Sequence, residues 1–166
     1  MMNSILKKYV IIFLSLFLLN TGVQARELQG RIGVGYNSEF SNTAATGGVP
    51  GVSIKYGLTR DFGIAGIFGM STADPANTVG ALKFFLNFFY ETNLNFYLMF
   101  AGGLVTANNT TAAEFLSGPG VEFFIPGLES VGFSFETGIG LTNLSGSFAI
   151  RTLGVSILNA GVHFYF

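Results

Sequence analysis

Cysteine is absent from the 166-residue sequence, and charged residues make up only 10% of it. The lack of cysteine excludes disulfides, thiolate metal sites and lipidation at an N-terminal cysteine. A soluble domain carries about 25% charged residues, so the low charge argues against an ordinary water-facing surface. The body of the chain also lacks the 18 or so consecutive apolar residues that indicate a transmembrane helix.

The first 25 residues have the organisation of a secretory signal. Lys7 and Lys8 form a basic region, residues 9–19 an apolar region (YVIIFLSLFLL), and residues 23–25 (VQA) a small-x-small cleavage site. Because the apolar region is too short to span a bilayer comfortably, we expect a cleavable signal peptide at 1–25 rather than a retained anchor. Cleavage after residue 25 would remove Lys7 and Lys8 and leave six basic and nine acidic side chains. This balance argues against a nucleic-acid partner.

Alternation of apolar with small or polar residues predicts β-strands through the rest of the chain. Residues 131–141 (VGFSFETGIGL) are an example, with Phe133, Phe135 and Ile139 on one face and Ser134, Glu136 and Gly138 on the other. Such segments occur at 28–36, 51–58, 62–70, 79–90, 94–105, 115–125, 131–141 and 155–166. No linker interrupts them, so we interpret residues 26–166 as one domain.

The connections between these segments alternate in length. Those after the second, fourth and sixth segments are short, whereas longer polar connections are expected at 37–50, 71–78, 106–114 and 142–154. Short turns on one rim and longer loops on the other are typical of outer-membrane barrels. An even number of strands places both termini on the short-turn rim.

The two faces of the strands indicate what surrounds them. One face is rich in Phe, and the other is mostly Gly, Ala and Ser with a few charges. A soluble barrel or sandwich would turn the Phe-rich face inward, but the interior of an eight-stranded barrel is only just wide enough for side chains. Lipid around the Phe-rich face removes the conflict. The sequence therefore predicts an all-β, eight-stranded antiparallel up-and-down transmembrane β-barrel in contact with outer-membrane lipids.

The chain ends in AGVHFYF, which places Val162, Phe164 and Phe166 on one face of the last strand. This ending resembles the C-terminal signal of bacterial outer-membrane proteins, and the resemblance implies that the barrel assembly machinery reads these three residues. Residues 28–166 resemble the small eight-stranded class typified by the transmembrane domain of outer membrane protein A and by outer membrane protein X. That resemblance implies a location in the outer membrane of a Gram-negative-type envelope.

Charged residues on the inward face are the main candidates for function. Alternation turns six of them toward the lumen: Arg31, Lys55, Lys83, Glu122, Glu136 and His163. Charges in a narrow interior must be paired or hydrated, so acids and bases are expected to face each other across the lumen. Inward aromatic residues would fill the remaining space: Phe85, Phe89, Tyr97, Phe124 and Tyr165. These features predict a plugged lumen and a structural envelope role, with a narrow porin-like pore for ions or small solutes as the alternative.

Other classes of function have less support in the sequence. A lipid-modifying enzyme needs a nucleophile beside a base, and His163, the single histidine, is not followed by a serine two residues later. We expect no enzymatic activity, no cofactor and no metal site. A surface-binding module remains a second alternative, with the polar loops, residues 37–50 above all, contacting an unidentified ligand.

Overall fold

A computed structural model describes residues 27–38, 40, 51–72, 76–107, 110–143, 146–153 and 158–166. The expected signal peptide lies outside these residues, as does most of the 37–50 connection. No helix among the described residues is long and apolar enough to cross a membrane.

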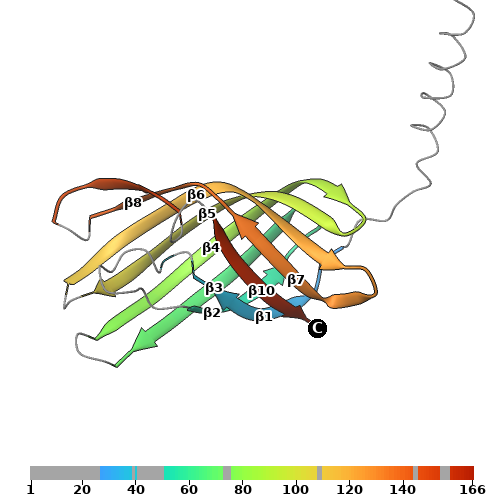
Figure 1. The fold of residues 1–166 in the computed structure, drawn as a ribbon, viewed down its shortest axis with the longest axis horizontal. Coiled ribbons are helices and arrows are strands. Elements are labelled where there is room, and N and C mark those ends of the chain that lie inside the picture. Colours follow the sequence, from blue (N-terminus) through green and yellow to red (C-terminus); the bar gives the residue numbers. More distant parts are fainter. Residues whose placement is uncertain are drawn as a thin grey trace, which may run out of the picture.

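The described residues contain ten β-strands (Figure 1). They are β1 Ile32–Asn37, β2 Gly51–Gly57, β3 Phe62–Ser71, β4 Asn77–Glu91, β5 Leu94–Ala107, β6 Thr110–Ile125, β7 Leu128–Glu136, β8 Ile139–Thr142, β9 Ala149–Thr152 and β10 Asn159–Tyr165. They begin and end close to most of the segments in which apolar and polar residues alternate.

The strands close into an antiparallel barrel. β1 to β6 pair in chain order, β6 pairs with β7, β7 with β10, and β10 with β1. β8 continues β7 along the other half of β6, and β9 pairs with β8 as β10 pairs with β7. Thus β7 with β8, and β9 with β10, are each two parts of one barrel strand, which gives eight strands in all. The eight-stranded antiparallel barrel expected from the sequence is confirmed.

The strands of the barrel are staggered. If paired residues are followed around the barrel from Tyr36 through β2 and β3, the path reaches Gly80 on β4. If they are followed the other way, through β10, β7, β6 and β5, the path reaches Glu91 on the same strand. The two paths end at different residues of β4, and this difference is the stagger. Closure of a barrel requires such an offset, because the strands tilt relative to its axis. Side chains far apart in a strand-by-strand alignment can therefore meet inside.

Both described ends of the barrel chain lie on the short-turn rim. The N–H of Phe166 donates to the Ile32 carbonyl at 2.9 Å, and the N–H of Ile32 donates to the Phe166 carbonyl at 3.3 Å. The C-terminus lies at the same end of the barrel as the turn between β6 and β7 (Figure 1). The even number of strands predicted this arrangement.

Our predictions of long loops at two of the connections are wrong in part. The 106–114 connection is mostly strand, because β5 and β6 extend until Ala107 pairs with Thr110. The Thr106 and Thr111 hydroxyls lie 2.8 Å apart across this pair of strands. The 142–154 connection contains β9, which pairs with β8 over four residues. Small polar residues suggested loops there, but their ladder hydrogen bonds and side-chain alternation continue the strands.

The first and last predicted strands also differ from the structure. β1 begins at Ile32 rather than at residue 28, and Gln29 makes an isolated bridge to Gly57. β10 spans Asn159–Tyr165, and residues 155–157 of the predicted last strand lie outside the described residues. A positive φ of 75° at Gly30 turns the chain before β1, so regular pairing starts after that glycine.

The outer face of the barrel is apolar. Large side chains on every barrel strand are exposed there, among them Ile32, Val52, Phe68, Leu82, Phe100, Phe115, Ile139 and Phe164. A typical soluble monomer rarely exposes a contiguous apolar patch of more than a few hundred square ångströms. The Phe-rich face is therefore the outer face, as alternation predicted.

Phe89 is a correction to the predicted lumen. We expected it to point inward, but its side chain is 48% exposed. The pairing of β4 with β5 shifts between Asn87 and Phe89, and a bulge of this kind reverses the face of every later residue. Phe88 and Phe89 consequently both lie outside near the short-turn rim.

Candidate functional site

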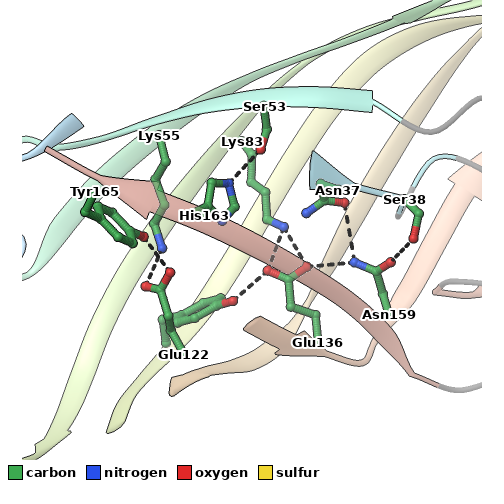
Figure 2. Close-up of polar contacts among 11 residues, drawn as sticks. Asn37, Ser38, Ser53, Lys55, Lys83, Glu122, Glu136, Asn159, His163 and Tyr165 are labelled. Carbon is green, nitrogen blue, oxygen red and sulfur yellow. Dashed lines mark hydrogen bonds and ion pairs between the residues drawn. The ribbon is translucent and has the colours of Figure 1, made fainter. Parts of the chain in front are cut away.

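The charged side chains inside the barrel come from strands that are distant in sequence (Figure 2). Lys55 is on β2, Lys83 on β4, Glu122 on β6 and Glu136 on β7. All four are almost fully buried, with side-chain exposures of 6% or less. Each occupies an inward position of its strand because its sequence neighbours are outward apolar residues.

Glu136 is the centre of the larger polar cluster. Lys83 Nζ donates to both of its carboxylate oxygens at 2.7 Å. The Tyr97 hydroxyl donates to Oε1 at 2.7 Å, and Asn159 Nδ2 donates to Oε2 at 3.1 Å. Four strands, β4, β5, β7 and β10, therefore meet at one carboxylate. Donors from three directions replace the water that a buried carboxylate would otherwise lose.

Asn159 extends this cluster toward β1. Its Nδ2 also lies 3.4 Å from Asn37 Oδ1, and its Oδ1 accepts from the Ser38 hydroxyl at 2.9 Å. Figure 2 shows Asn37 and Ser38 close to Asn159, which in turn lies beside Glu136. The amide thus links the central carboxylate to the end of β1.

Lys55 and Glu122 form the second ion pair. Lys55 Nζ donates to Glu122 Oε2 at 2.7 Å, and the Tyr165 hydroxyl donates to Oε1 at 2.5 Å. The Lys55 ammonium also lies 4.3 Å from the centre of the Phe85 ring, a distance at which a cation is attracted by the ring face. This pair joins β2, β6 and β10 across the lumen.

His163 lies beside Ser53 rather than in an ion pair. Ser53 Oγ and His163 Nε2 are 2.6 Å apart. The two residues sit on β2 and β10, and both pair with Gly35 of the intervening β1. A Cβ at position 35 would meet the Val162 carbonyl oxygen first and would lie 2.8 Å from both His163 Cα and His163 Cδ2, so glycine lets the β10 backbone and the imidazole approach β1 closely.

Arg31 lies apart from the two ion pairs. Its guanidinium approaches the backbone carbonyls of Glu129 and Tyr165 at 3.4 Å and lies 5.6 Å from the centre of the Tyr165 ring. These contacts place it at the short-turn rim, where it is partly exposed. Of the six predicted residues, the structure brings four into two ion pairs and places Arg31 and His163 in other contacts.

A third buried ion pair was missed by the sequence analysis. Arg151 on β9 contacts the Glu114 carboxylate on β6, and the Glu114 side chain is fully buried. Both residues belong to segments that we interpreted as loops, so no facing direction was assigned to them. A continuation of alternation through 112–116 and 149–152 would have been the signal.

Aromatic and apolar side chains occupy the lumen around the charges. Leu28, Phe124 and Tyr165 pack together toward the short-turn rim. On the other side of the ion pairs, a larger apolar cluster includes Phe40, Ile67, Met99, Leu116 and Leu153. Inward glycines admit the largest rings: a Cβ at Gly120 would lie 2.5 Å from Tyr97 Cε2, and one at Gly33 would lie 2.7 Å from Tyr165 Cε1. Apolar and aromatic side chains thus lie on both sides of the ion pairs.

A buried serine and histidine lie side by side inside the barrel. Among the described residues, no group of three or more His, Asp or Glu side chains is arranged to hold a metal ion. The Ser53 and His163 side chains are 1% and 3% exposed, and His163 Nδ1 has no hydrogen-bond partner in the described part of the chain.

Comparisons with known proteins agree with the fold. No protein-family model matches the chain, and no curated protein matches it by sequence. The chain is similar in structure to the N-terminal β-barrel domain of Pseudomonas aeruginosa OprF, with a TM-score of 0.53 and 18% sequence identity. The superposition covers 84% of this chain and 98% of that domain. The fold is therefore that of an eight-stranded outer-membrane β-barrel domain.

Proposed function

We propose that this chain is an integral β-barrel protein of the bacterial outer membrane, with a structural role in the envelope and a lumen closed to solutes. The observation that carries the proposal is the interior, where oppositely charged side chains from opposite walls meet at 2.7 Å. Apolar and aromatic side chains pack on either side of these pairs, which supports a closed lumen.

The outer surface supports the membrane location. Large apolar side chains are exposed around the barrel, and ladder hydrogen bonds satisfy most of the strand backbone. These are the two conditions for a structure that crosses a bilayer with β-strands. Membrane lipids are accordingly the main partners proposed, together with the barrel assembly machinery during biogenesis and export through the signal peptide at 1–25.

Enzymatic activity is not part of the proposal. The single histidine is buried beside Ser53 inside the barrel, away from the outer face on which lipid substrates would lie. The alternative of a surface-binding module depends mainly on residues 37–50, most of which lie outside the described residues.

Single-channel recording tests the closed lumen. We expect the refolded protein to give no steady conductance steps in a planar bilayer, because the Lys83–Glu136 and Lys55–Glu122 pairs cross the lumen. Insertion is established independently by labelling one introduced cysteine, Asn143→Cys, since the chain has no other cysteine. Reproducible steps that change in Lys83→Ala or Glu136→Ala would overturn the closed lumen and make the protein a narrow pore.

A further inference from the structure

The outer face of the barrel is hollowed along β6. One hollow has a volume of about 250 Å³ and is lined chiefly by Phe96, Pro119, Val121, Phe135 and Leu158. It opens sideways on the apolar outer face and has no charged residue in its lining.

A second hollow continues along the same strand. Its volume is about 220 Å³, and its lining includes Phe100, Phe115, Ser117, Ile139 and Leu141. The two hollows share β6 as their floor and have β5 on one side. Together they form what we call the β6 furrow, defined by the outer face of β6 from Phe115 to Val121.

Differences in side-chain size produce the furrow. Ser117 and Pro119 are the short outward residues of β6, whereas Phe96 and Phe100 on β5 form one ridge and Phe135 and Ile139 form the other. Pro119 supplies only a carbonyl to the neighbouring strand, and it accepts from the Thr137 N–H at 3.1 Å. The β6 furrow therefore results from two small side chains between rows of large ones.

The shape and surroundings of the furrow identify its occupant. Seven strand residues span about 20 Å, and half of a hydrocarbon core is about 15 Å thick. The two hollows follow one another along β6 and lie among exposed apolar side chains of the outer face. Given the proposed membrane location, on which this step rests, only hydrocarbon surrounds it. We infer that the β6 furrow binds one acyl chain of a membrane phospholipid and holds it more tightly than neighbouring lipid.

Fluorescence quenching tests this inference, because the chain has no tryptophan of its own. One variant, Phe135→Trp, carries the tryptophan probe in the furrow. The matched control, Phe68→Trp, carries it on β3, on the opposite side of the barrel. Both side chains are exposed aromatics in the wild type. Each variant is reconstituted in vesicles of phosphatidylcholine brominated on its acyl chains, and is then transferred into bromine-free detergent.

We expect both tryptophans to be quenched in the vesicles and only the furrow tryptophan to remain quenched in detergent. Adding Pro119→Phe to the Phe135→Trp variant should abolish the retained quenching, because the new ring fills the first hollow. Adding Gly66→Phe instead should leave it, since a Cβ at Gly66 meets no atom within 4 Å and faces outward on β3. Gel mobility with and without heating checks that every variant is folded.

Three results would overturn the inference. Loss of quenching from both tryptophans in detergent would show that the furrow holds only ordinary boundary lipid, and the membrane location would stand. Absence of quenching from both in vesicles would remove the proposed membrane location as well. Shielding of the furrow tryptophan alone, in a protein that elutes as a dimer, would show that a second copy of the chain fills the furrow.

Discussion

Glu136 shows at the scale of one residue how the barrel keeps a charge inside. Its carboxylate accepts from Lys83, Tyr97 and Asn159 and is 1% exposed. A buried ion pair contributes little beyond a well-packed apolar pair, but removing one partner leaves an uncompensated charge. The importance of Lys83 therefore lies mainly in what its absence would leave behind.

Lys83→Met should lower the free energy of unfolding by about 3–5 kcal/mol, because it leaves the Glu136 carboxylate buried without its cation. The double variant Lys83→Met/Glu136→Gln should recover most of that loss, since the amide can still accept from the Tyr97 hydroxyl. Urea titration in phospholipid vesicles, followed by circular dichroism, measures both changes.

Arg60→Met is the control for Lys83→Met, because Arg60 is an exposed cation in the turn between β2 and β3. Its loss should cost at most about 1 kcal/mol. Equal stabilities for Lys83→Met and the wild type would contradict the role assigned to the buried pair.

At the scale of the element, inward glycines decide how closely strands and rings approach. Gly120 lies on β6 opposite Tyr97 of β5 and Glu136 of β7. A side chain there would occupy the space of the Tyr97 ring. Because Tyr97 is fully buried and its hydroxyl is hydrogen-bonded to Glu136, the Tyr97 ring has little freedom to move aside.

Gly120→Ala should therefore destabilise the barrel by about 1–3 kcal/mol through overpacking. The added Cβ would lie 2.5 Å from Tyr97 Cε2. Gly66→Ala and Gly80→Ala are matched controls on outward strand positions, where a Cβ meets nothing within 4 Å. Both should be neutral or slightly stabilising in the same urea titration, since alanine reduces the entropy of the unfolded chain. A destabilisation shared by all three variants would point to strand glycines in general rather than to Tyr97.

At the scale of the whole molecule, closure depends on the two ends of the barrel chain. Phe166 and Ile32 exchange backbone hydrogen bonds next to the pairing of β10 with β1. The Phe166 side chain makes little contact with the rest of the protein, with 80% of it exposed. An exposed terminal ring is what the proposed recognition by the barrel assembly machinery requires.

Deleting Phe166 should reduce the amount of protein in the outer membrane, because the terminal aromatic would no longer mark the last strand for assembly. Quantitative immunoblotting of isolated outer membranes measures this. Phe62→Ala is a control, since Phe62 is also an exposed aromatic near the short-turn rim. Refolding into detergent, where the assembly machinery is absent, should be much less affected. Normal outer-membrane levels of the deletion variant would contradict a role of Phe166 in assembly.

The sequence alone determined the strands and the identity of each face over most of the chain. Alternation is a local property, so it correctly turned Lys55, Lys83, Glu122 and Glu136 inward and the Phe-rich face outward. It failed at Phe89, where a bulge in β4 reverses the face, and at Glu114 and Arg151, whose segments were interpreted as loops. A bulge depends on the neighbouring strand, so the sequence of β4 by itself carried no sign of it.

Only the tertiary structure decided which charges meet. Glu122 and Glu136 lie on adjacent strands, and alternation did not predict that Lys55 would pair with Glu122 and Lys83 with Glu136. The choice follows from the stagger of the closed barrel, which fixes the height of every inward residue along the axis. The β6 furrow also depends on strand pairing, because its ridges belong to β5 and to the β7 and β8 segments that pair on either side of Ser117 and Pro119.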